Sequence, residues 1–185
     1  MYGPDLGDIK GKSTTNKPAP ITSDLIGIPD EFIRVQEDVT LSMDGLTVNG
    51  LNFLTTISHD IYYRTAQPLS AKPNYQEFIV NLKEIELLYR KAGFKLSEIH
   101  ADSQFKKTLK EFSCLYDPVI NVNLASAGEH VPWTERNNRV IKERVRAAYH
   151  QLPVPRLPKL LITYLVMNLA RKLNFFPAKH GLSKH

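Results

Sequence analysis

Three short alternating segments near residue 50 constrain the fold of this chain most strongly. Apolar and polar residues alternate from residue 39 to Asp44, as expected for a half-buried strand. Asn49-Gly50 then marks a two-residue hairpin turn. Residues 51–57 and 61–66 have the pattern of a second and a third strand. We therefore expect an antiparallel three-stranded meander, with Asp44 at the end of its first strand.

Helices and strands alternate after the meander. Prolines at 68 and 73 break the strand pattern, and Asn74 followed by Glu77 predicts a helix start, with Gly93 at the expected stop. The remaining predicted elements are a strand over 94–101, a short helix over 104–112, a strand over 119–124, and helices over 133–150 and 159–173. This order is that of the ribonuclease H-like fold, an α/β fold in which a five-stranded mixed sheet is flanked by helices.

The length of 185 residues favours one domain with irregular ends. We expect an extended leader or interdomain segment over residues 1–37, a core over 38–151, and a linker with a C-terminal helix that packs on the core over 152–185. No apolar run is long enough to span a membrane and no secretory signal is visible, so we expect neither a membrane partner nor export. Cys114 is the only cysteine, which excludes a cysteine-based zinc site, and its apolar surroundings predict a core position.

Positive charge is concentrated in the last third of the chain. From Trp133 onward there are 11 lysines and arginines against two acids, whereas the preceding residues hold 13 against 17. Such a basic region is the expected footprint of a phosphate-binding protein, and it is equally compatible with a solvated surface.

Three acids stand near predicted element ends: Asp44, Asp102 after the fourth strand, and Glu135 at the start of a long basic helix. Carboxylates are the oxygen ligands that Mg²⁺ prefers, and two such ions about 4 Å apart serve phosphoryl transfer on DNA. We therefore predict that Asp44, Asp102 and Glu135 are metal ligands and catalytic residues. Glu129 is a weaker rival to Glu135, because it lies in the loop before the helix.

The stretch TERNNRVIKERVR carries a family resemblance: Glu135 is followed by Arg136 and, two residues later, by Asn138-Arg139. Over residues 39–177 the chain resembles the catalytic core of retroviral and retrotransposon integrases, most of all those of copia-type long-terminal-repeat elements. Asp102 lies 58 positions after Asp44, and Glu135 follows 33 positions later, close to the family's spacing. The C-terminal helix also ends as in the family, in an Asn, two residues and a Pro, here Asn174 and Pro177.

The resemblance implies metal-dependent processing of DNA 3′ ends and their transfer into target DNA, with Mg²⁺ or Mn²⁺ bound as two ions. It implies DNA and further copies of the chain as partners, a nuclear site of action after a cytoplasmic particle stage, and an origin within a polyprotein. The complete enzyme is expected to carry a zinc-binding amino-terminal domain and a carboxy-terminal DNA-binding region as well. The predicted DNA-binding residues are Arg136, Asn138, Arg139, Lys142 and Arg146, which lie along the basic helix, although a role as solvated charges carries equal weight.

Two departures from the family's pattern support an alternative. Asp102 is followed by Ser-Gln-Phe, and HVPWT precedes Glu135, instead of the family's usual sequences. A decayed or co-opted integrase fold that binds nucleic acid or a partner without catalysis is therefore the alternative hypothesis. A cut-and-paste transposase core is a weaker alternative hypothesis, because the residues around Glu135 argue against it.

Trp133 is expected to secure the helix start rather than to stack on a base. The histidines lack the spacing of metal ligands.

Overall fold

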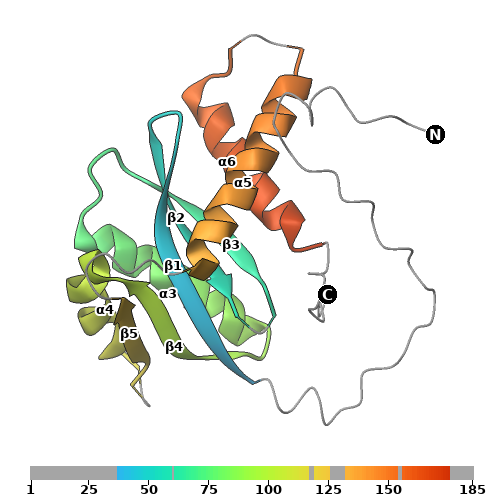
Figure 1. Cartoon of the computed structure of the whole chain (residues 1–185). Coiled ribbons are helices and arrows are strands. Elements are labelled where there is room, and N and C mark those ends of the chain that lie inside the picture. Colours follow the sequence, from blue (N-terminus) through green and yellow to red (C-terminus); the bar gives the residue numbers. More distant parts are fainter. Residues whose placement is uncertain (1–36, 60, 117–118, 126–131, 154–155, 176–185) are drawn as a thin grey trace, which may run out of the picture.

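The structure, a computed structural model, describes residues 37–59, 61–116, 119–125, 132–153 and 156–175. A five-stranded mixed sheet flanked by four helices forms its centre (Figure 1). The elements are β1 (Asp38–Val48), β2 (Leu51–Ser58), β3 (Arg64–Leu69), α3 (Tyr75–Lys91), β4 (Lys95–Asp102), the 3₁₀ turn η1 (Ser103–Phe105), α4 (Lys106–Ser113), β5 (Asn121–Ala125), α5 (Pro132–Gln151) and α6 (Lys159–Leu173).

The strands are arranged in the order β3-β2-β1-β4-β5. The first three pair antiparallel, whereas β4 pairs parallel with β1 and with β5. Asn49 and Gly50 both have positive φ, 49° and 73°, as the primed hairpin turns require. The predicted α/β class and the antiparallel meander are therefore confirmed.

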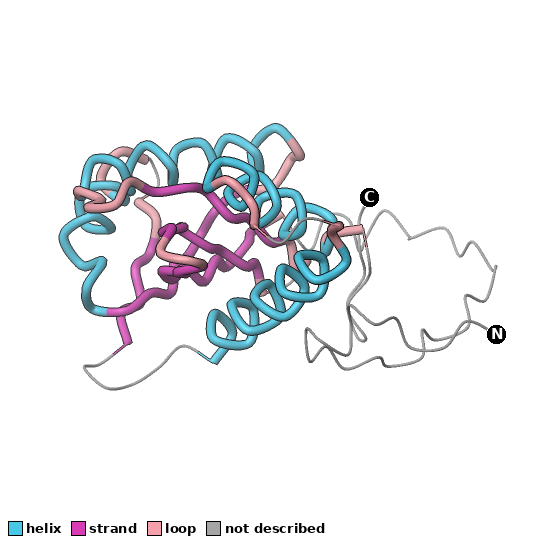
Figure 2. Tube along the Cα trace, turned by 90° about the horizontal axis from the view of Figure 1, so that it is seen from above, coloured by secondary structure: helices cyan, strands magenta, loops and turns pink. Residues whose placement is uncertain are grey.

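Two helices cover each face of the sheet (Figure 2). On one face, α3 and α4 enclose the larger core, whose centre includes Met43, Ile85 and Phe112. On the other face, α5 and α6 pack on the hairpin end of the sheet, where Phe53 and Ile141 are fully buried. Because the residues of a strand alternate sides, β1, β2 and β3 contribute to both cores, whereas the apolar residues of β4 and β5 belong to the first one.

Two strand boundaries differ from the sequence-based expectation. β1 continues to Val48, so Asp44 lies inside this strand and not at its end. β3 spans Arg64–Leu69 instead of 61–66, because the Ser58 N–H donates to the Tyr63 carbonyl and closes the turn first. Pro68 lies within β3, which is possible because β3 is the edge of the sheet and needs no ladder bond on its outer side.

The helix boundaries follow the local signals more closely. Asn74 Oδ1 accepts the Glu77 N–H at 2.9 Å, and Gly93 has φ +82° just beyond α3, so both ends of this helix are confirmed. The Glu77 carboxylate, however, bonds to Ser70 instead of returning to the cap residue. Cys114 was expected in the core and is instead exposed, because it follows the last turn of α4 at the protein surface.

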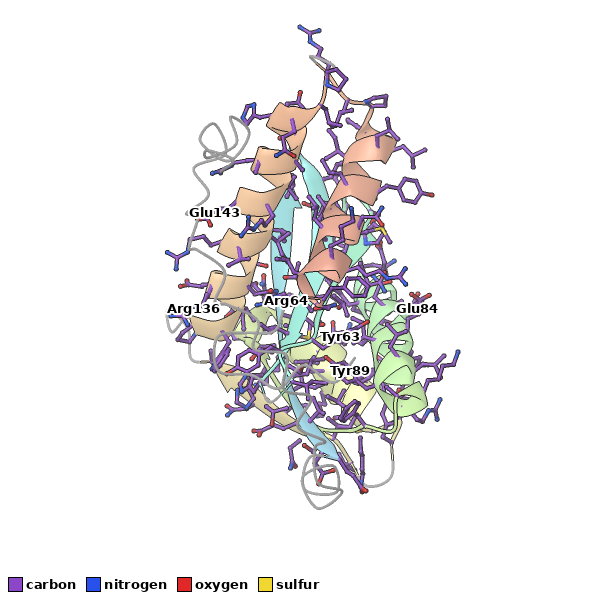
Figure 3. The ribbon with its side chains drawn as sticks, turned by 90° about the vertical axis from the view of Figure 1, so that its right-hand side faces the viewer. Tyr63, Arg64, Glu84, Tyr89, Arg136 and Glu143 are labelled. Carbon is purple, nitrogen blue, oxygen red and sulfur yellow. The ribbon has the colours of Figure 1, made fainter. Side chains whose placement is uncertain are left out.

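Asn174 joins the end of α6 to the start of β3. Its side chain accepts the Arg64 N–H and donates to the Arg64 carbonyl, each at 2.8 Å. The Arg64 side chain is seen near the end of α6 in Figure 3. Burial lowers the pKa of its guanidinium, and Nε has no partner among the described residues. Asn174 therefore has a structural role, whereas Pro177 and the expected leader over residues 1–37 lie outside the described residues, apart from residue 37. None of the helices described is long and apolar enough to cross a bilayer.

Candidate active site

Asp44 is the best-defined of the three predicted acids. It lies on β1 opposite Thr55 of β2 and is half-buried. Its Oδ1 accepts the Gly45 N–H at 2.6 Å, and its Oδ2 accepts Nδ2–H of Asn138 at 2.9 Å. These two bonds fix the orientation of the Asp44 carboxylate.

Asn138 of α5 connects Asp44 to the centre of the sheet. Its Nδ2 also lies 3.3 Å from the Gly45 carbonyl, and its Oδ1 lies 2.6 Å from the Thr55 hydroxyl. That hydroxyl is also 3.1 Å from the Asp44 carbonyl, so its single proton is shared between two acceptors. Only 9% of Asn138 is exposed. Asn138 was predicted to contact DNA, but its buried amide is already bonded within the fold, and it acts here as a positioning residue.

Asp102 lies beside Asp44 through strand register. The parallel pairing of β1 with β4 matches Ser42 with His100, and two residues further along each strand come Asp44 and Asp102. Residues at equal positions on paired strands project to the same face, and neighbouring strands are about 4.8 Å apart. Asp102 is the last residue of β4, one position later than the predicted end of this strand, and its side chain makes no capping bond to η1. If the register continued by two residues, the two carboxylates would lie side by side on the face that α5 covers in part.

Glu135 lies on a different element from these two acids. It is in the first turn of α5, as predicted, three residues before Asn138. The helix begins at Pro132, and the first position of a helix suits proline. Glu135 is exposed and lines a hollow of about 400 Å³ together with Pro132, Arg136 and Arg139. Within the described ranges, no three His, Cys, Asp or Glu side chains lie close enough to share a metal ion. The loop over residues 126–131, which includes Glu129, lies outside those ranges.

A basic stripe extends from Glu135 along α5. Arg139, Lys142 and Arg146 follow Glu135 at four, seven and eleven positions, which places all four residues on one side of the helix. Lys142 and Arg146 line a hollow of about 530 Å³ beside the β1–β2 hairpin. Arg136 projects from the outer side of α5 (Figure 3). The stripe therefore provides a series of cations that leads from the hairpin toward the acids.

A cluster of rings supports the start of α5 on the same face of the sheet. Trp133 stacks on His59 with ring centroids 5.0 Å apart and an interplanar angle of 21°. His59 Nε2 lies 2.5 Å from Ser42 Oγ, and its ring meets that of His100 edge-on at 5.0 Å. His100 Nε2 is 3.1 Å from Glu98 Oε1, and Nε2 has no hydrogen-bond partner among the described residues. Trp133 thus packs against the fold at the helix start.

Thr55, Ser42 and His59 belong to this site, although no motif marks them. Ser42 and Thr55 lie on strands and His59 directly follows β2, and each is linked to the site by a hydrogen bond that spans 17 to 83 residues of sequence. The alternation of β1 alone predicts that Ser42 and Asp44 share a face. Which residues of β2 and α5 they meet depends on the register and on helix docking.

No protein-family model matches this chain. A search of curated proteins finds no significant match either. The fold and the geometry of the site are therefore the basis for any functional assignment. They define an α/β protein with a five-stranded mixed sheet, a pair of carboxylates on neighbouring parallel strands, and a basic helix anchored to one of them.

Proposed function

We propose that this chain is the catalytic core of a retrotransposon integrase with a ribonuclease H-like fold, most similar to the copia type. In this proposal it processes the 3′ ends of element DNA and transfers them into target DNA. One observation carries the proposal: Asp44 and Asp102 each lie two residues beyond the last pair of the parallel strands, Ser42 with His100, while Asn138, three residues after Glu135, holds Asp44. The element order and the mixed sheet support the same proposal.

The side chains at this edge of the sheet suit a hard divalent cation such as Mg²⁺ or Mn²⁺. Asp44 and Asp102 offer carboxylate oxygens from neighbouring strands, and the Asn138 and Gly45 bonds orient the Asp44 carboxylate. Glu135 would supply the third carboxylate from α5. When bound, a pair of such ions activates an oxygen nucleophile and stabilises charge on the phosphate.

Two displacements at phosphorus make up the proposed activity. In 3′-end processing, a water oxygen bonds to phosphorus, the bond from phosphorus to the 3′ oxygen breaks, and that oxygen takes a proton to become a hydroxyl. In strand transfer, this hydroxyl bonds to a target phosphorus and the target's own bond to its 3′ oxygen breaks, so the number of phosphodiesters is unchanged. Asp44 and Asp102 would hold the cations that neutralise the reacting phosphate, and Arg139, Lys142 and Arg146 bind the DNA backbone beside it.

A strand-transfer assay and a disintegration assay test this proposal, each with Mg²⁺ or Mn²⁺. Asp44→Asn is expected to reduce the product to background, because the amide keeps the shape but loses the charge that a cation needs. Asp38→Asn is the matched control, since it makes the same change at an exposed position of the same strand and should keep wild-type activity. Full activity of Asp44→Asn would contradict the proposal.

The alternative is an integrase fold that binds nucleic acid or a partner without catalysis. The position of Glu135 favours it, because this carboxylate lines a hollow with Arg136 and Arg139. Salt-sensitive DNA binding with no turnover in either metal, by the wild type and by Asp44→Asn alike, would establish this function. The catalytic proposal further implies that copies of the chain assemble to hold two DNA ends, with the nucleus as the site of action.

A further inference from the structure

A cavity of about 520 Å³ opens where β1 extends beyond β4. The pairing of these strands reaches Ser42 with His100, and β4 ends at Asp102, whereas β1 continues to Val48. The last part of β1 therefore has no described strand beside it on this side. Asp44 and Gly45 border the cavity, and Gln104, two residues after Asp102, lines it as well.

Aromatic rings form the opposite wall. Tyr75 and Phe78 come from the first turn of α3, and the Phe78 ring meets the edge of Phe105 at 5.3 Å, which holds it in place. Lys107 Nζ lies 4.4 Å from the centre of the Tyr75 ring, a cation–π contact. The Tyr75 side is open to solvent, with 36% of the residue exposed.

Gly45 keeps the cavity open on the strand side. A Cβ added at this position would meet no atom within 4 Å, and the φ of Gly45 is not in the left-handed region. A larger residue could therefore be accommodated by the backbone but would fill the cavity. Gly45 thus offers a direct way to block the cavity with little backbone strain.

The lining combines flat rings, a cation and a polar group. Gln104, two residues after Asp102, makes no hydrogen bond with any described residue, so its amide is available to a ligand. Lys107 supplies positive charge at the same wall. Aromatic side chains beside basic ones are what proteins use to bind single-stranded nucleic acid, because every base has a face that stacks.

We propose that this cavity holds one unpaired base of a DNA strand whose backbone crosses the edge formed by Asp44 and Asp102. The inference rests on the proposed function, since it takes its ligand from the DNA substrate. Tyr75 stacks on the base, Lys107 contacts the neighbouring phosphate, and the Gln104 amide meets the polar edge of the base.

The test uses the full chain and a duplex with a short single-stranded 3′ extension, in which abasic sites replace the bases one at a time. Affinity is measured by fluorescence anisotropy without divalent metal, so that no turnover interferes. We expect Tyr75→Ala to weaken binding about tenfold, and one abasic position to do the same. Combining the two should cause little further loss, because both remove the same contact.

Two further variants complete the design. Gly45→Leu should reproduce the loss by filling the cavity, and it guards against misfolding as the cause of the Tyr75 result. Tyr164→Ala on α6 is the matched control, because Tyr164 is 54% exposed and lies on another helix. Its affinity should equal that of the wild type. The inference would be overturned if the affinity losses from Tyr75→Ala and from the abasic site added up in the combination. It would also be overturned if no abasic position weakened binding.

The outcomes also separate this inference from the proposed function. A base-sensitive position in a protein that performs no strand transfer supports the cavity and refutes catalysis. Metal-dependent strand transfer that Gly45→Leu and Tyr75→Ala leave unchanged, with no abasic effect, refutes the cavity and retains catalysis.

Discussion

Replacing Asn138 by alanine should weaken the attachment of α5 to the sheet by an amount that the structure allows us to estimate. The bond from Nδ2 to the Asp44 carboxylate is charge-assisted, and such bonds contribute about 1.5–3 kcal/mol. Because Asp44 is half-buried, we take the lower part of that range. The Thr55 bond adds little, since that hydroxyl can turn to the Asp44 carbonyl at 3.1 Å.

Asn137 provides the matched control. It is buried like Asn138, with 2% exposed against 9%, but its amide has no hydrogen-bond partner among the described residues. Both substitutions remove the same atoms and gain the same helix propensity, so these contributions cancel in the comparison. The free energy of unfolding should therefore be lower for Asn138→Ala than for Asn137→Ala by about 2 kcal/mol.

Urea unfolding followed by tryptophan fluorescence measures this difference. Trp133 is the only tryptophan and stacks on His59 at the start of α5, so its emission reports the docking of this helix. With a typical denaturant slope, 2 kcal/mol corresponds to a difference in midpoint of about 1 M urea. Equal midpoints for the two variants would refute the view that the Asp44–Asn138 bond anchors the helix.

Three further predictions concern other parts of the molecule. Asn174→Ala should remove both bonds to the Arg64 backbone, lower the free energy of unfolding by about 1–3 kcal/mol, and abolish hydrogen-exchange protection of the Arg64 amide; unchanged protection would contradict the role of this side chain. Arg146→Gln should reduce the slope of log affinity for DNA against log salt by about 0.9, whereas Arg144→Gln, on another side of α5, should not change it. Burial raises the pKa of Tyr89 above the ordinary tyrosine value of about 10. The free energy of unfolding should therefore fall as the pH rises above about 10, because the tyrosine then ionises more readily in the unfolded chain. Tyr89→Phe should lose less stability in this pH range than the wild type.

Local sequence signals predicted the elements that depend on local physics. The hairpin follows from Asn49-Gly50, because few residues adopt positive φ without strain. The start of α3 follows from Asn74, whose side chain bonds to an N–H three residues later. Glu135 in the first turn of α5 follows for the same kind of reason, since helix starts favour acids.

The boundaries of β3 and the position of Asp44 within β1 could not be predicted in this way. A proline normally ends a strand, and Pro68 is tolerated only because β3 lies at the edge of the sheet. Likewise, β1 continues beyond Asp44 because it pairs with β2 as far as the hairpin, although the alternation of its residues becomes irregular there.

The sequence by itself determined which chemistry this chain carries: three acids, a basic helix and a meander that begins an α/β sheet. Only the tertiary structure decided which of these groups meet. The pairing of β1 with β4 sets the position of Asp102 relative to Asp44. The packing of α5 on the sheet buries Asn138 and lets its side chain bond to Asp44. Because β1 extends beyond β4, a cavity opens beside Gly45. Pairing across 58 to 94 residues depends on the packing of the whole core, and no local pattern encodes it.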